Sequence, residues 1–440
     1  MAAEYDLVIL GGTGAGLSAA ITAARTSRIA LVLSSPASVE LFWFQQALGE
    51  FTRLHARTAH PDRNLLARAT QYATAVVTRL KQKYSPANLG RLGIDVITGE
   101  GNFQTQPTLQ FCVAGRQLRS HSYLIAGTPP CPENHPRQLL RQLSSPQPPQ
   151  ACVLLGNGPV QVELAQILAR LQIDTTLLLP QPFLALEERA VALLLRSHLE
   201  AEGVKLIHDQ TASTVDPHLY PKEEMAAHDA SQAVGLVEKE KSAENWLNLT
   251  ATGVRLTQGR LRVNAYLQTA NPRIYACGEI LGGYPLAELA HAEARVALHN
   301  ALHRHPLGLG QHRIDYRLIP WRINTDPALA RVGCTVAQAR RCYGQDVMVL
   351  EQDDQTQDRS HLKSETTGLC QLVVRQNGDI LGAIAIGLAA SEMIQLIALA
   401  MVQRLKVTDL ADLATGSPTL SDICFDTASR WLESLRKSHN

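Results

Sequence analysis

The chain has 440 residues, which is too long for one small domain and predicts two or three. Its 41 basic and 40 acidic residues balance, so the composition gives no electrostatic reason to expect nucleic acid as a partner. We expect no membrane partner and a cytoplasmic location. The apolar run Leu381–Leu388 is too short to span a bilayer, and the N-terminus lacks a secretory signal pattern.

Two segments of the chain share one order of predicted elements. An apolar strand at Tyr5–Leu10 precedes the glycine-rich turn Gly11–Gly16, a helix at Leu17–Thr26 and a further strand at Ile29–Leu33. A strand, a glycine-rich turn and a helix in this order are typical of a dinucleotide-binding βαβ unit. The second unit has a strand at Cys152–Leu155, the turn Gly156–Gln161, a helix at Val162–Leu171 and a strand at Thr175–Leu179.

Between and after these units the pattern changes. Composition predicts a linker at Ser144–Gln150 and a solvated loop region at His208–Asn245. A strand at Ile274–Cys277 then leads into Gly278-Glu279. The remaining predicted elements are a helix at Leu286–Leu302, strands at Cys370–Arg375 and Ile380–Ile386 joined by the turn Gln376–Asp379, and a helix at Ser391–Leu405.

The eight cysteines form neither a CxxC nor a CxxxxC motif, which favours ordinary thiols in a reducing compartment. His303 and His305 have no second pair of ligands at metal-binding spacing, so no metal site is predicted.

Four later segments carry a resemblance to a known family: Val263–Ile280, Asp315–Trp321, Thr325–Gly333 and Ser417–Asp422. With the two glycine-rich turns, they resemble the class I FAD-dependent pyridine nucleotide–disulfide oxidoreductases, of the mercuric reductase and lipoamide dehydrogenase kind. The resemblance implies an α/β fold with two Rossmann-like dinucleotide-binding domains, as in glutathione reductase, and a C-terminal α+β dimerisation domain. It implies a homodimer and these domains: an FAD-binding domain in two parts (1–143 and 266–312), an NAD-binding-like domain (151–265) and a dimerisation domain (313–440).

The resemblance also implies an FAD site closed by Gly278, whose backbone can approach the pyrophosphate, and by an acid that binds a ribityl hydroxyl. The acid here is Glu279, where the family has Asp, and Leu33 stands where an acid binds the adenosine ribose. At Thr13 the family has glycine, and the threonine could either crowd the pyrophosphate or bond to it. The implied cofactor-binding residues are Gly11, Gly12, Thr13, Gly14, Ala15, Gly16, Ala126, Gly127, Gly278, Glu279, Leu286 and Ala287.

The residues that carry the family's chemistry are missing. The two redox cysteines correspond to Ala37 and Phe42, and the C-terminal histidine to Ser417, followed by the acid Asp422. We therefore assign no catalytic residue. A lysine that pairs with a glutamate near the flavin corresponds to Gln46, while the glutamate remains as Glu163. The sequence leaves open whether Phe42, Trp43 or Phe44 covers a flavin face or packs in the core.

The nicotinamide site departs from the family pattern as well. Gln161 stands at the third glycine of the second turn, and Leu179-Pro180 stands where an acid would bind the NAD ribose. We expect NAD(P)H to bind weakly or not at all.

Three functions follow from this comparison. The first is an FAD-binding oxidoreductase or electron-transfer protein without a CxxxxC relay, with a protein or a small molecule as redox partner. The second is a catalytically silent homodimer that binds a partner or has a structural role. The third is a thiol reductase that uses an unpaired cysteine such as Cys277, although that side chain is expected to point into the core.

Overall fold

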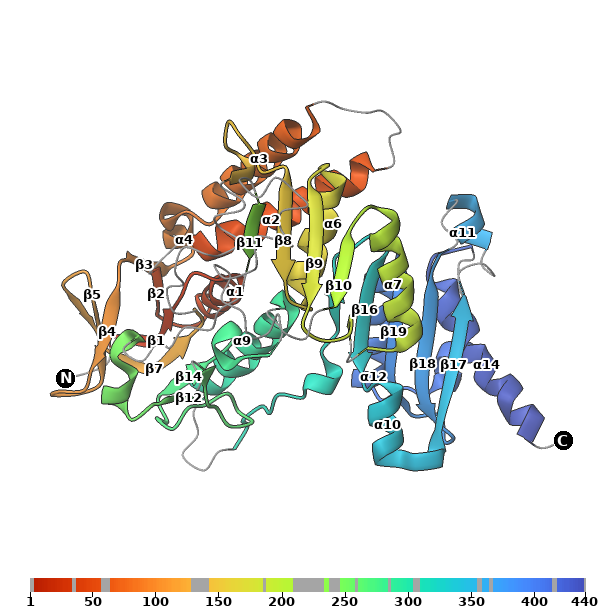
Figure 1. Cartoon of the computed structure of the whole chain (residues 1–440). Coiled ribbons are helices and arrows are strands. Elements are labelled where there is room, and N and C mark those ends of the chain that lie inside the picture. Colours follow the sequence, from red (N-terminus) through yellow and green to blue (C-terminus); the bar gives the residue numbers. More distant parts are fainter. Residues whose placement is uncertain are drawn as a thin grey trace. The chain divides into compact units, whose positions relative to one another are not determined.

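The computed structural model describes residues 4–33, 37–56, 64–127, 142–184, 187–208, 233–236, 246–257, 260–283, 286–303, 309–353, 358–363, 367–413 and 418–438 (Figure 1). The chain divides into two units. Unit 1 comprises Met1–Gln150 and Ser231–Ile314, and unit 2 comprises Ala151–Ala230 and Asp315–Asn440.

Unit 1 is built on a parallel five-stranded sheet with the order β14-β7-β1-β2-β3. The central strand β1 is apolar and buried on both faces, as expected for a parallel sheet covered on both sides. Because β14 pairs with β7, the closing segment lies one strand away from β1. The strands are β1 (Tyr5–Leu10), β2 (Ile29–Leu33), β3 (Ile94–Thr98), β7 (Ser120–Ile125) and β14 (Ile274–Ala276).

Alternate side chains of β1 enter two separate cores. Leu7 and Ile9 pack with the helices α1 (Gly14–Ala23) and α9 (Ala287–Leu302). Val8 and Leu10 face the opposite core, to which the antiparallel sheet of β4 (Gly101–Gln104), β5 (Gln110–Val113) and β6 (Arg116–Leu118) contributes.

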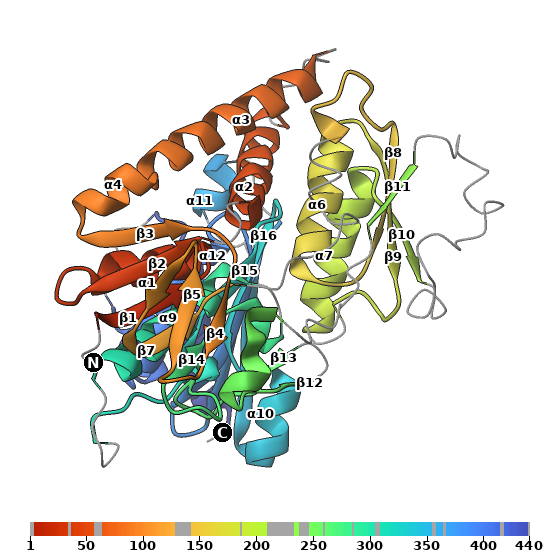
Figure 2. The same ribbon diagram turned by 90° about the vertical axis from the view of Figure 1, so that its left-hand side faces the viewer.

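Helices α2 (Ala37–His55) and α3 (Leu65–Lys83) lie side by side (Figure 2). Smaller elements are α4 (Pro86–Arg91), β11 (Ala233–Leu236), η3 (Trp246–Thr252), β12 (Leu256–Thr257), β13 (Arg260–Leu261) and η4 (Glu279–Leu281).

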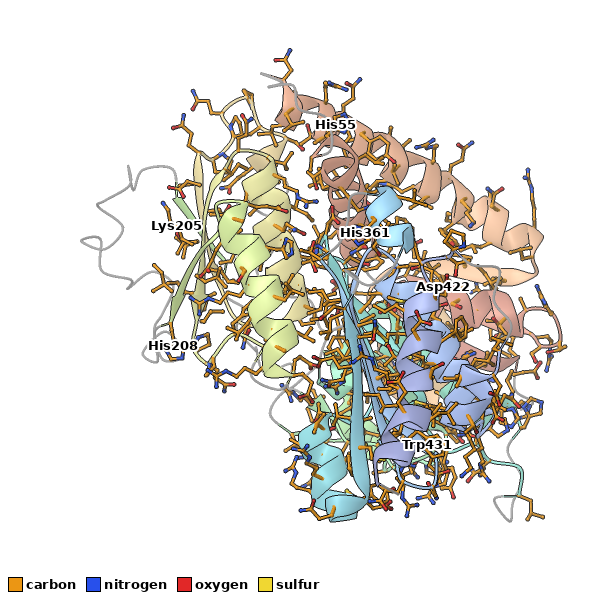
Figure 3. The ribbon with its side chains drawn as sticks, turned by 90° about the vertical axis from the view of Figure 1, so that its right-hand side faces the viewer. His55, Lys205, His208, His361, Asp422 and Trp431 are labelled. Carbon is orange, nitrogen blue, oxygen red and sulfur yellow. The ribbon has the colours of Figure 1, made fainter. Side chains whose placement is uncertain are left out.

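The first part of unit 2 is a second parallel arrangement, in which β9 pairs with both β8 and β10. Helices α6 and α7 cover the same face of these strands, as both views show (Figures 1 and 2). Lys205 and His208 mark the two ends of β10 (Figure 3). The elements are β8 (Ala151–Leu155), α6 (Pro159–Arg170), β9 (Asp174–Leu179), α7 (Arg189–Ala201) and β10 (Lys205–His208).

The second part of unit 2 is an antiparallel five-stranded sheet with the order β15-β16-β19-β18-β17. Its core also contains apolar residues of α12 (Ala390–Val402) and α14 (Asp422–Ser438). The strands are β15 (Trp321–Ile323), β16 (Ala328–Gly333), β17 (Val347–Asp353), β18 (Leu369–Arg375) and β19 (Ile380–Gly387); the remaining helices are η5 (Tyr316–Leu318), α10 (Val336–Tyr343), η6 (Gly344–Asp346), α11 (Asp358–Lys363) and α13 (Val407–Ala411). Among the residues described, no helix combines the length and apolar character that a membrane crossing requires.

Two sequence expectations need revision. The helix expected to reach Leu405 ends at Val402, because Arg404 adopts a positive φ of 55° and the N–H of Leu405 returns to the Ala400 carbonyl. Part of the expected loop at 208–245 is the strand β11, and most of the rest lies outside the described residues. Leu249 and other residues of the stretch before residue 265 pack in a core of unit 1.

Candidate functional site

A cavity of about 120 Å³ opens in unit 1 where β1, β7 and β14 end. Nine of the twelve residues that we expected to bind the cofactor line it: Thr13, Gly14, Ala15, Ala126, Gly127, Gly278, Glu279, Leu286 and Ala287. They come from four segments of the chain, which meet here because parallel strands place their carboxyl ends at one edge of a sheet.

The other three predicted residues, Gly11, Gly12 and Gly16, do not line this cavity. Backbone packing requires glycine at 11 and 16, and a Cβ on Gly12 would lie 2.7 Å from the Leu33 Cδ2. Gly11 has φ +127°, and a Cβ on it would lie 2.6 Å from the Ala126 carbonyl oxygen. A Cβ on Gly16 would lie 2.2 Å from the Gly11 carbonyl oxygen. These glycines are required because α1, β1 and the end of β7 approach so closely that no side chain fits between them.

Thr13 is the N-cap of helix α1. Its Oγ1 accepts a hydrogen bond from the Gly16 N–H at 3.2 Å and donates one to the Ala126 carbonyl at 2.5 Å. The hydroxyl proton is therefore donated within the protein. Gly14 and Ala15 place the first N–H groups of the helix at the cavity wall, where the positive end of the helix dipole attracts anions.

The closing turn is held by a residue that the sequence analysis missed. The N–H of Gly278, which has φ +83°, donates to a carboxylate oxygen of Glu293 on α9 at 2.6 Å. Glu293 is only 5% exposed and lines the cavity. Burial, and then the charge of Glu293, raise the pKa of the Cys277 thiol well above its ordinary value. A neutral, fully buried Cys277 is a poor nucleophile, so the thiol-reductase hypothesis loses its candidate residue.

Two more residues line the cavity that are not among the twelve implied cofactor-binding residues. His291 lies close to α1, since a Cβ on Gly14 would be 3.5 Å from its Nε2. Phe42 lines the cavity and is 44% exposed, whereas Trp43 stacks on Tyr84 with ring centroids 5.5 Å apart. Of the aromatic residues considered, Phe42 thus faces the cavity and Trp43 packs in the core. The one-turn spacing of 287, 291 and of 286, 290, 293 along α9 was the available signal for His291 and Glu293.

The second glycine-rich turn, in unit 2, is covered by its own side chains. The Gln161 Oε1 lies 2.7 Å from the position of a Cβ on Gly158, and its Cδ lies 3.3 Å from that of Gly156. The Asn157 amide donates to the Pro182 carbonyl at 2.6 Å and accepts from the Leu184 N–H at 2.9 Å. These contacts tie the loop that follows β9 to the turn, at the place where a dinucleotide would meet the backbone.

Other residues considered in the sequence have structural partners in unit 2. Glu163 is buried, and its Oε1 accepts from the Asn324 N–H at 2.8 Å. The Asp422 carboxylate accepts from the Thr419 N–H at 2.9 Å and the Thr419 hydroxyl at 2.6 Å, at the start of α14 (Figure 3). Ser417 lies outside the described residues.

Within the part of the chain that the structure describes, no group of three or more His, Cys, Asp or Glu side chains is arranged to hold a metal ion. His303 stacks on His299 with ring centroids 4.6 Å apart, while His305 lies outside the described residues.

Comparison with known proteins identifies the family. Residues 5–294 match the pyridine nucleotide-disulphide oxidoreductase family, and residues 319–427 match its dimerisation domain. The mercuric reductase of Staphylococcus aureus is 28% identical over 93% of this chain and 79% of its own length. A dihydrolipoyl dehydrogenase of Bacillus subtilis (strain 168) is 25% identical over 97% of this chain and 98% of its own length.

Solved structures show the same fold. The copper(II) complex of the HOCl-induced flavoprotein disulfide reductase RclA from Escherichia coli has a TM-score of 0.77 and 23% identity, and covers 98% of this chain and 100% of its own. LpdA from Mycobacterium tuberculosis has a TM-score of 0.78 and 22% identity, and covers 96% and 99%. The expected α/β fold with a C-terminal dimerisation domain is thereby confirmed, and the dimerisation domain supports a homodimer. The chain belongs to the pyridine nucleotide-disulphide oxidoreductase family, whose members are FAD-dependent flavoproteins.

Proposed function

We propose that this protein binds FAD in the unit 1 cavity and acts as an oxidoreductase or electron-transfer protein without a CxxxxC disulfide relay. One observation carries the proposal. Four segments far apart in the sequence, at residues 13–15, 126–127, 278–279 and 286–287, line a single cavity at the carboxyl edge of a parallel sheet. The edge where parallel strands end is the general place for a dinucleotide in this kind of fold.

The lining residues fit FAD in chemistry. The N–H groups of Gly14 and Ala15 at the start of α1 suit a pyrophosphate, and the positive φ of Gly278 lets backbone and cofactor approach closely. Glu279 is exposed at the cavity and offers a carboxylate to a ribityl hydroxyl. Leu33 offers no such acceptor to the adenosine ribose, so we expect weaker FAD retention than an acid at that position would give.

Bound FAD would supply a redox centre that takes up or releases electrons in one or two steps. Helix α2, which carries the redox cysteines in the resembled family, contains no cysteine here and presents Phe42 to the cavity. The buried Cys277 keeps its proton. We therefore propose that electrons pass directly between the flavin and a protein or small-molecule partner.

We further propose that NAD(P)H is not the efficient electron donor, although the family is named for its use of pyridine nucleotides. The support comes from the Gln161 side chain, which lies over Gly156 and Gly158, and from Leu179-Pro180 at the end of β9. A dinucleotide would have to displace the Gln161 side chain and would find Leu179-Pro180, not an acid, at the end of β9.

The second candidate is a redox-silent homodimer with a binding or structural role. Helix α2 favours it, because this helix contains no cysteine that could relay electrons from a flavin. The two candidates differ in one property, namely whether the folded protein holds a flavin.

The test is the visible spectrum of the purified protein, before and after incubation with FAD and removal of the excess. We expect flavin absorption in the near-ultraviolet and blue, and a lower flavin content in Glu279→Ala. Glu100→Ala, at an exposed position away from the cavity, is the matched control and should retain wild-type flavin content. A folded wild type that stays colourless with added FAD would leave the silent homodimer as the function.

A further inference from the structure

The His291 imidazole lies at the wall of the unit 1 cavity without a partner in the described part of the chain. It belongs to α9, and a Cβ on Gly14 would lie 3.5 Å from its Nε2 and 3.7 Å from its Cε1. Among the described residues, none forms a hydrogen bond or ion pair with this ring. By contrast, ring nitrogens of His299 and His303 on the same helix lie at hydrogen-bond distance from backbone carbonyls. The His291 ring is therefore available to a bound molecule.

The edge of this ring approaches the part of α1 that attracts anions. Gly14 and Ala15 line the same cavity as His291. Their N–H groups precede the first hydrogen bond of the helix, which the Leu17 N–H donates to the Thr13 carbonyl at 2.9 Å. The first N–H groups of a helix lack intrahelical acceptors, and the helix dipole favours negative charge there. Backbone donors and an imidazole nitrogen thus meet at one place.

This combination of groups suits a phosphate. A phosphate oxygen at the start of a helix accepts backbone N–H groups and needs no side chain for that contact. An imidazole beside it adds a donor from Nε2, and in its protonated form it adds a positive charge that strengthens the hydrogen bond. FAD carries a diphosphate and riboflavin carries no phosphate, so such an imidazole would act on the first and not on the second.

We propose that His291 binds FAD directly, by donating from Nε2 to a phosphate oxygen, and that its protonated form favours the phosphate-bearing flavin over riboflavin. The inference rests on the proposed function, because it needs FAD in this cavity. It adds a specificity-determining residue and a pH dependence, neither of which the backbone N–H groups at Gly14 and Ala15 could supply.

The other charged groups around the cavity leave the direction of this effect unchanged. The ionisable side chains that line it with His291 are Cys277, Glu279 and Glu293. A Cβ on Gly282, which lines the cavity, would lie 2.9 Å from the Arg260 Nη1, so a permanent cation is also close. Helix α1 has no ionisable side chain, and α2 presents Val39 and Phe42. Further ionisable residues of the strands beside α9, and of α9 near His291, do not line the cavity: Tyr5, Asp6, His121, Tyr123, Tyr275, Glu288 and Arg295.

The sign of the pH dependence follows from linkage. A bound diphosphate favours the charged imidazole, so His291 holds its proton more tightly in the complex than in the free protein. FAD affinity is therefore highest below the titration range of the free protein, falls as pH rises through the range between the two states, and is constant above it. The charge of Arg260 does not change between about pH 5.5 and about pH 9, so this residue cannot produce such a fall.

The test is a fluorescence titration of flavin-free protein with FAD, and separately with riboflavin, from about pH 5.5 to about pH 9. Four proteins are compared: wild type, His291→Asn, His291→Lys, and Arg295→Gln as the control. Arg295 is exposed one turn further along α9 and does not line the cavity, so its substitution removes a cation from the same helix without touching the site. Circular dichroism at each pH confirms that each protein is folded.

We expect wild type to bind FAD more tightly than His291→Asn at the lower end of the range, on the order of tenfold, and about equally at the upper end. His291→Lys keeps its charge and should bind FAD more tightly than wild type at about pH 9. Arg295→Gln should keep the wild-type profile. Riboflavin affinity that is equal in wild type and His291→Asn, or too low to measure in every protein, supports a contact to phosphate.

Three results overturn the inference and leave the proposed function intact. The first is an equal FAD affinity and pH profile in wild type and His291→Asn. The second is an equal loss of FAD and riboflavin affinity in His291→Asn, because the histidine would then act on the flavin or on the fold. The third is His291→Lys binding no more tightly than wild type at about pH 9. If folded wild type binds no FAD at any pH, the proposed function fails and the inference fails with it.

Discussion

The Gln161 carboxamide oxygen lies 2.7 Å from the position that a Cβ on Gly158 would occupy, so this side chain fills the concave side of the second glycine-rich turn. We predict that micromolar NADH or NADPH does not bleach the flavin. The lack of a charged hydrogen-bond partner for the ribose by itself weakens the binding of NADH or NADPH by roughly 1.5–3 kcal/mol, on the order of tenfold to a hundredfold in affinity. Stopped-flow absorbance measures the rate of flavin bleaching directly. Gln161→Gly should bind NADH more tightly than wild type, and rapid bleaching of the wild-type flavin would contradict the prediction.

Thr13 should stabilise the folded protein because it caps helix α1. Thr13→Ala removes the oxygen that accepts from Gly16 and the hydroxyl that donates to Ala126, so we expect a loss of about 1 kcal/mol in the free energy of unfolding. Thr13→Ser retains both groups and should lose much less. Urea unfolding followed by circular dichroism compares the two, and equal losses would show that the threonine methyl group, not the cap, carries the effect.

Cys370 on β18 and Cys424 on α14 are fully buried with their Sγ atoms 3.9 Å apart, close enough for a disulfide after a small adjustment. We predict that the azo oxidant diamide, which takes two electrons and two protons from the thiols, links this pair when it is added while the reduced protein refolds and both thiols are still accessible. The bond would close a loop of 54 residues and stabilise the protein by about 4 kcal/mol in the chain-entropy model. Peptide mapping without reductant identifies the bond. Cys424→Ala should abolish it, and a preference for other cysteine pairs would refute the assignment.

The Asp95 carboxylate should make the folded protein less stable in acid than at neutral pH. Hydrogen bonds from the Arg116 guanidinium and the Tyr5 hydroxyl lower the pKa of Asp95, with that of Arg116 the larger effect. A carboxyl whose pKa is lower in the folded state contributes stability at neutral pH and loses it as pH falls through its unfolded value of about 4 towards the folded value. The Asp95 and Arg116 side chains are more than one third exposed, so we expect their contribution to the free energy of unfolding to be less than about 1 kcal/mol. Asp95→Asn should be less stable than wild type at pH 7, and this deficit should shrink in acid.

The chain should be a homodimer of about twice the 48.0 kDa chain mass in light scattering. Helix α12 carries Leu399 and Val402 with 57% and 51% of their surfaces exposed, which is apolar area for a partner subunit to cover. Leu399→Asp should shift the protein towards the monomer, whereas Leu193→Asp, at an exposed apolar position on α7, should not. A monodisperse wild-type monomer at micromolar concentration contradicts the prediction.

The local elements of this protein were predictable because their causes are local. Alternating or continuous apolar runs ending in glycine, as at Leu10-Gly11 and Leu155-Gly156, predict a strand followed by a tight turn whatever the rest of the chain does. The closing segment at Gly278 was predictable for the same reason. Nine of the residues that line the cavity were therefore expected from sequence, since these nine follow the ends of parallel strands or begin a helix.

Only the tertiary structure determines which side chains each site presents and in which direction they point. The direction of the Thr13 hydroxyl at the cavity depends on the Ala126 carbonyl, 113 residues away. Glu293 enters the cavity only because α9 packs across the turn at Gly278, and the side chain of Gln161 could have pointed away from its own turn. A sequence specifies which groups are present and their spacing along a helix or strand. The direction of a side chain, and hence the charge inside a cavity, follows from which backbone packs against which.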